Sequence, residues 1–484
     1  MSDIILLYPK TGMDVGSTVA PPHNLLCVAA PLDNTGYKVR IIDQRVDKQW
    51  KLHLLEELKT SPVFVGISTM TGTQVGHAVN AARFVRAHSN TPVVWGGPHP
   101  SLLPVQVLES GLADHVCVGE ADETIVQTAQ DISNGGASKI IKSPLPDVEN
   151  LLPTPWHLID VEKYVHSDVY LKKGRHLDVG QTSRGCPFQC GFCSSASLRE
   201  RKWRAMSPDK ALDMISRAVT DFDLNGFWLR DDEFYISQSR AAKIAEGLIP
   251  FGVRWYTSGT RVDVFNKTPD DQVDLYRRAG AGTLKFGAES GNNRVLELMG
   301  KGITREDTLE ANQKCKRHDI TPAFAFMAGF PRETFEEIED TVDLARQLRR
   351  DNPRAQFETM APYLALPGTP MWKLALSYGL KPPTKLEDWS RWIVDEYDDE
   401  GSKLPWYNAK ERQAIGNLCY LSMLSNAVPN VLDSLNGRGK LLKLAYAVPH
   451  KYWQWRFFGR HYKWSGELQL VRALRRRVFY SNGR

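Results

Sequence analysis

The chain has 484 residues, of which 42% are hydrophobic and 24% are charged, a composition typical of a globular protein with two to four domains. No apolar run approaches the roughly 20 residues that a membrane-spanning helix needs, and the opening MSDIILLYPK lacks the basic n-region of a secretory signal. Seven cysteines in so long a chain favour a reducing compartment, so we expect a cytoplasmic protein whose thiols are free to bind metals.

Residues 1–135 alternate short apolar runs with helix-length amphipathic stretches. The apolar runs are strand candidates of the kind buried in a parallel sheet, at 3–9, 37–43, 63–69, 91–97 and 114–120. This alternation predicts an α/β fold, in which a doubly wound, Rossmann-like sheet offers a ligand crevice at the carboxyl ends of its strands.

A second series of strands follows a linker at 136–174, which is rich in glycine and proline. Six strand candidates recur at intervals of roughly 30 to 50 residues, the size of a βαβ unit. They lie at 176–182, 226–232, 253–259, 282–288, 322–329 and 356–364. They predict a partial (β/α)6 barrel over 175–375, with its chemistry in the loops after the strands. Residues 376–484 are predicted to form a helical region that is aromatic-rich and basic.

Three cysteines follow the first barrel strand with the spacing C-x3-C-x2-C, at Cys186, Cys190 and Cys193. Three thiolates on one loop can hold three irons of a [4Fe–4S] cluster and leave the fourth iron open to another molecule. The alternative is a zinc site that a distant histidine completes. The other four cysteines are scattered singly, and we interpret them as packing residues: Cys27, Cys117, Cys315 and Cys419.

At this loop the sequence resembles the radical S-adenosylmethionine (SAM) enzymes, whose signature is the same triple with an aromatic residue, here Phe192, before the last cysteine. The resemblance implies that SAM chelates the open iron and is cleaved reductively to a 5′-deoxyadenosyl radical, with Phe192 beside the adenine. It also implies SAM contacts in the segments LRDDEF, SGTRVD and FGAESG, at Asp231, Arg261, Glu289 and Ser290. For Arg261 a structural ion pair is an equal alternative, and a carboxylate after a strand is often only a helix cap.

Over residues 3–375 the chain resembles the radical SAM subgroup that carries a cobalamin-binding domain before the barrel. The matching loop segments are PPHNLLCVAA, GISTMTGT, WGGPHPSLLP and VCVGEADETI. The resemblance implies cobalamin contacts at Thr11, Ser68, Thr69, Thr71, Gly96, Gly97, Pro98, His99 and Glu120. The two glycines let the backbone approach a bulky ligand, although they also suit a tight turn.

The D-x-H-x-x-G motif, whose histidine ligates cobalt in many cobalamin domains, is absent after the first strand, where the sequence reads YPKTGMDVGST. We therefore predict that cobalamin binds without a histidine ligand. His23 and His99 are the alternative lower ligands, and both also suit a surface loop.

The end of the chain is basic, because residues 431–484 hold 12 lysines and arginines against 2 acidic residues. Seven aromatic residues lie within 452–464, and the densest basic run is Arg475, Arg476 and Arg477. Such a segment can pack onto the barrel, contact a membrane surface or a lipophilic substrate, or stack on nucleic acid. Packing is the first interpretation and a peripheral membrane contact the second. We expect no nucleic-acid partner, because no RNA-binding module accompanies the segment.

These resemblances predict a cobalamin-dependent radical SAM methyltransferase that uses methylcobalamin to methylate an unactivated carbon. The alternatives are a cobalamin-binding radical SAM enzyme that does not methylate, such as an oxidative cyclase, and a non-catalytic iron–sulfur protein. The implied cofactors are a [4Fe–4S] cluster, SAM and cobalamin. The implied partners are a small-molecule substrate, with lipophilic molecules among the options, and an external electron donor of the flavodoxin or ferredoxin type.

Overall fold

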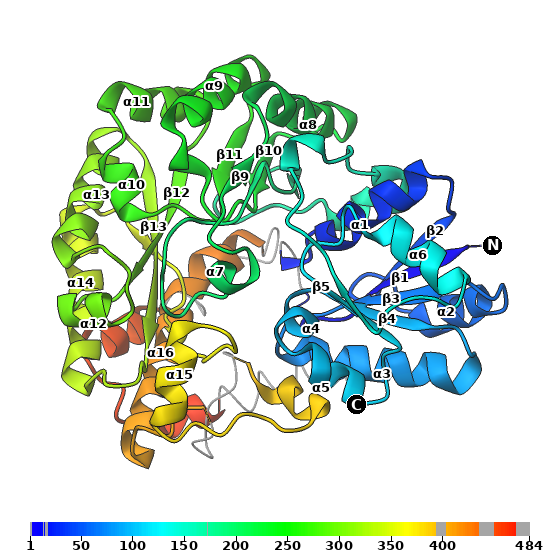
Figure 1. Cartoon of the computed structure of the whole chain (residues 1–484). Coiled ribbons are helices and arrows are strands. Elements are labelled where there is room, and N and C mark those ends of the chain that lie inside the picture. Colours follow the sequence, from blue (N-terminus) through cyan, green and yellow to red (C-terminus); the bar gives the residue numbers. More distant parts are fainter. Residues whose placement is uncertain are drawn as a thin grey trace.

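The computed structural model describes residues 2–12, 14, 18–171, 173–393, 403–434 and 450–470, with side chains in the last long helix as far as residue 425. The first domain, coloured blue to cyan, lies beside a barrel drawn mainly in green (Figure 1). Helices of the C-terminal region, in yellow and orange, lie against the barrel's other edge (Figure 1). No described helix is long and apolar enough to cross a membrane.

The first domain is built on a parallel sheet in the order β2-β1-β3-β4-β5-β6. The five predicted strands are confirmed as β1 (Ile4–Tyr8), β2 (Val39–Asp43), β3 (Phe64–Ser68), β4 (Val93–Gly96) and β5 (His115–Val118). A sixth strand, β6 (Ile140–Lys142), lies inside the segment that we expected to be a linker. Because β1 lies between β2 and β3, the strand order reverses there, and the ligand crevice of such a sheet opens at this point.

Helices cover both faces of this sheet, because its strands are apolar on both sides. One face packs against α1 (His23–Asn34) and α6 (Ile125–Ser133) through residues such as Leu6 and Phe64. The other face packs against α2 (Trp50–Leu58), α3 (Thr73–His88) and α5 (Pro104–Glu109) through residues such as Leu7 and Val65. The short helix α4 (Pro98–Leu102) follows β4 directly. This is the doubly wound arrangement that the sequence predicted.

The second domain is the predicted partial barrel of parallel strands. Its strands are β7 (His176–Asp178), β10 (Gly226–Leu229), β11 (Arg254–Thr257), β12 (Thr283–Glu289), β13 (Thr321–Ala328), β14 (Gln356–Phe357) and β15 (Ala361–Pro362). Isolated parallel bridges, Trp255 to Ala281 and Thr260 to Phe286, connect β11 to β12. All six predicted strand segments are confirmed, with β14 and β15 both inside the last of them.

The helices of the barrel connect its successive strands. They are α8 (Pro208–Asp221), α9 (Gln238–Leu248), α10 (Val262–Asn266), α11 (Asp270–Arg278), α12 (Asn293–Leu298), α13 (Arg305–Arg317) and α14 (Phe335–Asp351). Capping boxes fix the start of two of them, through Thr304 with Asp307 and Thr334 with Glu337. A short antiparallel pair, β8 (Ser183–Arg184) and β9 (Arg204–Ala205), flanks the cysteine loop, which also contains α7 (Ser195–Leu198).

The C-terminal region contains the helices α15 (Pro370–Ser377) and α16 (Ala409–Ser434) and the 3-10 helix η7 (Leu386–Arg391), with non-helical segments between them. The η7 segment lies on the first domain, where Trp389 Nε1 donates a hydrogen bond of 2.6 Å to Gln106 Oε1. The aromatic segment 452–464 packs partly onto α14, since the buried Tyr462 hydroxyl donates to Glu339 and Arg460 pairs with Asp343. The basic run Arg475, Arg476 and Arg477 lies outside the described residues.

Candidate functional site

The cysteine loop follows β7 and is anchored by the barrel at Met299 and by α15 at Met371. The Gly191 amide donates to the Met299 carbonyl at 2.7 Å, and the Gly191 carbonyl accepts from the Met371 amide at 2.9 Å. All three cysteines of the loop are free, and Cys190 is buried. Burial raises the pKa of Cys186 to about 11 and also raises the pKa of Cys193. Binding a metal at these thiols would therefore release protons.

This donor set suits an iron–sulfur cubane. Three thiols are presented on one loop, and the guanidinium of Arg261 lies 3.3 Å from the sulfur of Cys190, where it can compensate thiolate charge. Within the described residues, no three His, Cys, Asp or Glu side chains are gathered as ligands of a single ion. The thiolates of a cubane need not converge on one ion, because each of them binds a different iron of the cluster.

Arg261 is held firmly against the cysteine loop. Its guanidinium stacks 3.7 Å from the ring centroid of Phe188, donates to the Lys301 carbonyl at 2.5 Å and pairs with Asp263 at 2.9 Å. Arg261 thus forms the structural ion pair that was one of the two hypotheses from the sequence, and it also contacts the cysteine loop. A direct contact with SAM stays a prediction.

Phe192 and Glu289 lie near one another around Lys301. Lys301 Nζ is 2.7 Å from Glu289 Oε1 and 5.8 Å from the centroid of the Phe192 ring. Gly287 leaves the space for this pair, since a Cβ there would lie 2.4 Å from Glu289 Oε1. Two of the predicted SAM contacts, Phe192 and Glu289, therefore lie around the same ammonium group, and Lys301 is a neighbour that was not predicted from the sequence.

The side chains of Asp231 and Ser290 accept hydrogen bonds from neighbouring protein groups, including backbone amides. Asp231 is buried and accepts hydrogen bonds from the Thr182 amide and hydroxyl, both at 2.7 Å, and from the Ser183 hydroxyl at 2.6 Å. Ser290 Oγ accepts from the Asn292 amide at 3.1 Å and lies 3.3 Å from the Thr341 hydroxyl. These partners favour a positioning role for both residues, with Asp231 fixing the strand that leads into the cysteine loop.

A cavity of about 710 Å³, here called the interdomain cavity, extends from the face of the first sheet under α1 to the barrel. Five of the predicted cobalamin contacts line it: Ser68, Gly96, Gly97, Pro98 and Glu120. Gly97 has φ +95°, and a Cβ there would lie 2.9 Å from Ser68 Oγ, so this wall accepts only a glycine. The cavity has an apolar wall, and at its polar edge Gly97 leaves open space beside Ser68. This combination suits cobalamin, which has a bulky ring and a nucleotide tail.

The other four predicted cobalamin contacts do not line this cavity: Thr11, Thr69, Thr71 and His99. His99 is fully buried, with Nδ1 3.1 Å from the Thr71 hydroxyl and its ring 5.5 Å from the ring of Trp389. Burial lowers the pKa of His99 to about 4, so its imidazole is neutral near pH 7. His23, the other candidate cobalt ligand, does line the cavity, but its Nε2 lies 3.2 Å from the Asp178 carboxylate.

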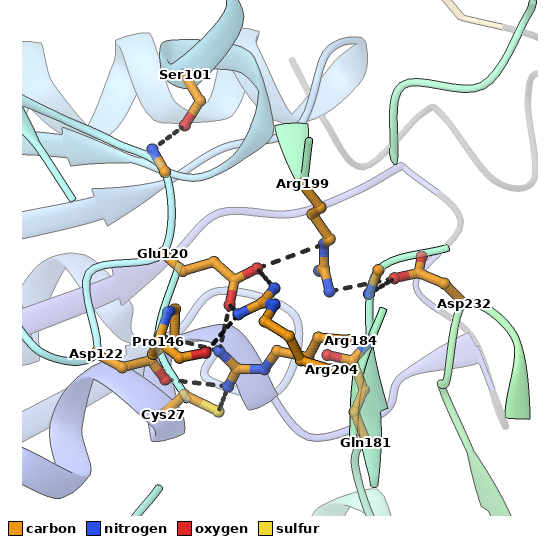
Figure 2. A network of polar contacts seen from close by, with 12 residues as sticks. Cys27, Ser101, Glu120, Asp122, Pro146, Gln181, Arg184, Arg199, Arg204 and Asp232 are labelled. Atoms are coloured by element: carbon orange, nitrogen blue, oxygen red, sulfur yellow. Dashed lines mark hydrogen bonds and ion pairs between the residues drawn. The ribbon is translucent and has the colours of Figure 1, made fainter. Parts of the chain in front are cut away.

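Figure 2 shows a set of ion pairs that joins the two domains, here called the interdomain cluster and made of Glu120, Asp122, Arg184, Arg199 and Arg204. Arg184 Nη1 lies 2.8 Å from Glu120 Oε2, and its Nη2 lies 3.0 Å from Asp122 Oδ1. Arg204 Nη2 reaches Glu120 Oε1 at 2.7 Å, and Arg199 reaches the same oxygen at 3.7 Å.

Glu120 is the carboxylate shared by the three arginines of the interdomain cluster. Burial acts to raise the pKa of Glu120, but the hydrogen bond from Arg204 and the charges of Arg184 and Arg199 outweigh it and hold that pKa below its usual value. Glu120 was predicted at the cobalamin site from the sequence, whereas its three arginine partners were not. The only sequence signal for Arg184 was its place two residues before Cys186.

Two family models match the chain, one in each of the two domains. The family model described as "B12 binding domain" matches residues 10–129, and the model described as "Radical SAM superfamily" matches residues 181–345. The chain joins a B12-binding domain to a radical SAM domain. These domains imply cobalamin, SAM and a [4Fe–4S] cluster, the three cofactors that the sequence predicted.

Individual relatives include both methyltransferases and cyclases. The chain is 28% identical over 465 residues to the uncharacterized methyltransferase PH0819 of Pyrococcus horikoshii, covering 91% of this chain and 96% of that protein. It is 26% identical to the anaerobic magnesium-protoporphyrin IX monomethyl ester cyclase of Rubrivivax gelatinosus, covering 71% of this chain but 65% of that protein. The fold resembles the cobalamin-dependent SAM radical enzyme OxsB with a TM-score of 0.71 at 17% identity, covering 93% of this chain and 71% of that chain.

Proposed function

We propose that the chain is a cobalamin-dependent radical SAM methyltransferase that methylates an unactivated carbon of a small-molecule substrate. One observation carries the proposal: Arg184, two residues before Cys186, is ion-paired with Glu120 and Asp122, which line the interdomain cavity. The proposed cobalamin site and the proposed cluster site are thereby held at the same junction between the domains. A substrate between them would be accessible to both cofactors.

The residues of this chain would hold and orient the cofactors. Cys186, Cys190 and Cys193 would bind the cluster, with Arg261 donating to the sulfur of Cys190. Phe192 would pack against the adenine of SAM. When bound, the cluster would supply the electron that cleaves SAM, and cobalamin would carry the methyl group. An external electron donor of the flavodoxin or ferredoxin type would reduce the cluster.

The buried walls of the cavity would exclude water from this chemistry. Leu6, Phe64 and Val94 of the first sheet form the apolar wall, and Val179 contributes from the barrel. Gly97 would let the cofactor approach the backbone next to Ser68. Asp231 would keep the strand before the cysteine loop in register, through Thr182 and Ser183.

A second candidate is an oxidative cyclase, and the 26% identity to the Rubrivivax gelatinosus cyclase is the observation that favours it. The two reactions differ in how they consume SAM. A methyltransferase uses one SAM as methyl donor and one as radical source, so S-adenosylhomocysteine and 5′-deoxyadenosine appear together. A cyclase produces 5′-deoxyadenosine alone, and a non-catalytic iron–sulfur protein produces neither.

Product analysis therefore tests the proposal. The full chain, reconstituted without oxygen and loaded with cobalamin, would be incubated with SAM, a reductant and candidate small molecules, with the Cys190→Ala variant as control. Both products in equal amounts, with neither in the control, support the methyltransferase. 5′-Deoxyadenosine alone would support the cyclase and contradict our proposal.

A further inference from the structure

The carboxylate of Asp178, at the end of β7, connects side chains from the two domains. Asp178 is fully buried, and its Oδ1 accepts from the Gly180 amide at 3.0 Å and lies 3.2 Å from His23 Nε2. Its Oδ2 is paired with Arg230 Nε. Arg230 is the residue after β10, and its carbonyl accepts from the Gln181 side chain at 2.7 Å. Both the backbone and the Nε edge of Arg230 are therefore fixed.

The outer edge of the Arg230 guanidinium is available for a ligand. Its side chain is 49% exposed and lines the interdomain cavity. Within the described part of the chain, its two Nη groups make no hydrogen bond or ion pair. Other cations that line the cavity are engaged by protein groups: Arg184 and Arg199 by Glu120, Arg217 by Asp213, and Lys210 by the carbonyl of Leu151.

The amino end of α1 adds positive potential at the same place. This helix of 12 residues begins at His23, the residue that contacts Asp178, and its N-cap residue Pro22 supplies no capping side chain. His23 and Asn24 both line the cavity. The His23 and Leu25 amides donate to the carbonyls of Pro21 and Pro22, so what α1 adds here is the positive end of its dipole, which acts in the same direction as Arg230.

We propose that Arg230, oriented by Asp178 and His23, is the anion-binding side chain of the interdomain cavity. The planar Nη pair of an arginine matches two oxygens of a phosphate or carboxylate. Two sources can supply that group: the phosphodiester in the nucleotide tail of cobalamin, or a phosphate or carboxylate of the substrate. The choice of these two candidate anions rests on the proposed function, whereas the site at Arg230 follows from the geometry alone.

Titration with inorganic phosphate tests the site without any catalysis. Full-length protein, both cobalamin-free and cobalamin-loaded, would be titrated by calorimetry in a buffer free of other multivalent anions. The variants are Arg230→Gln, which removes the charge, and Arg230→Lys, which keeps the charge but loses the paired donors. Arg217→Gln is the matched control, because Arg217 lines the same cavity and pairs with Asp213 at the surface. Circular dichroism would check the fold of each variant.

We expect the cobalamin-free wild type and Arg217→Gln to bind phosphate alike. Arg230→Gln should bind it at least about tenfold more weakly, the usual effect of losing a hydrogen bond to a charged group. Arg230→Lys should fall between them, and it decides the test if Arg230→Gln does not fold. Equal phosphate affinity in the wild type and the folded Arg230 variants, or no binding by the wild type, would overturn the proposal.

The cobalamin-loaded protein separates the two sources. If the phosphodiester of cobalamin occupies the site, loading abolishes phosphate binding, and Arg230→Gln weakens cobalamin binding without weakening that of cobinamide, which lacks the phosphodiester. If the anion belongs to the substrate, the loaded protein still binds phosphate, and Arg230→Gln leaves cobalamin affinity unchanged. Failure to form methyl-transfer products would refute the proposed function and leave both phosphate results standing.

Discussion

Arg184 Nη1 lies 2.8 Å from Glu120 Oε2, and this ion pair runs from the start of the cysteine loop to the wall of the interdomain cavity. Both side chains are nearly buried, with exposures of 8% and 13%, so water screens the pair only weakly. A displacement of either loop would separate the two charges. The position of the proposed cluster site is therefore energetically coupled to the wall of the proposed cobalamin site.

We predict that Glu120→Gln weakens this junction. The change leaves three arginines facing a neutral amide, and removing one partner of a buried ion pair is strongly destabilising. The thermal unfolding midpoint of the cofactor-free protein should fall by about 5 °C or more. The control is Asp213→Asn, which breaks an exposed pair with Arg217 and should change the midpoint little. Equal midpoints for wild type and Glu120→Gln would contradict the prediction.

We predict that protein reconstituted without oxygen binds about four irons and four sulfides. Cys186→Ala, Cys190→Ala and Cys193→Ala should each lose the cluster and abolish SAM cleavage, as measured by iron content and by 5′-deoxyadenosine formation. Cys315→Ala should retain both, because Cys315 is buried inside α13, away from the loop. Tetrahedral zinc in protein purified without oxygen would refute the prediction.

We predict that bound cob(II)alamin has no histidine nitrogen ligand. His99 is outside the lining of the interdomain cavity, and the Nε2 of His23 is engaged by Asp178. The electron paramagnetic resonance spectrum of the loaded protein should therefore show no triplet splitting from a histidine nitrogen, and any triplet from the nucleotide base of cobalamin should persist when either histidine is replaced. His23→Ala and His99→Ala provide the check, since a triplet present in the wild type and absent in either variant would show a histidine ligand.

We predict that Glu333→Gln stabilises the cofactor-free protein increasingly as the pH rises from 5 to 8. Glu333 is buried, and burial raises its pKa to about 8 from a usual value of 4.5. In this range the unfolded chain releases the proton while the folded chain keeps it, so the wild type loses stability, by at most about 1.4 kcal/mol for each pH unit. Glutamine carries no such proton and can still accept from the Gly329 and Phe330 amides.

Unfolding midpoints at several pH values would measure this difference. Glu337→Gln is the control from the same segment, because the hydrogen bond from Arg294 holds the pKa of Glu337 below its usual value. Glu337 is therefore ionised in both states above pH 5, and its variant should show no growing advantage. A constant difference between Glu333→Gln and the wild type would contradict the prediction.

The sequence predicted most of the fold because buried parallel strands appear as apolar runs, as at Ile4–Tyr8 and Phe64–Ser68. The cysteine triple was equally visible, since its spacing is local. β6 was missed because Ile140–Lys142 is a strand of three residues between glycine- and proline-rich stretches. Such a segment has no periodicity from which to predict a strand.

The partners of the site residues were much harder to predict. Arg184 and Glu120 are 64 residues apart, and their contact depends on how two domains pack together. The roles of Asp231 and Arg230 also depend on side-chain direction, since these neighbours face Thr182 and the interdomain cavity respectively. Local sequence patterns carry no information on either of these points.

The place of β6 bears on any attempt to produce the first domain by itself. β6 covers the outer edge of β5, with Val116 paired to Ile140 and Val118 to Lys142. A fragment that stopped at residue 135 would leave that edge open to other chains, and exposed strand edges promote aggregation. Tyr164, beyond β6, is also buried and donates to Asp43 Oδ2 at 2.9 Å. The smallest autonomous folding unit should therefore extend to about residue 165, well past the end of the matched B12-binding segment at residue 129.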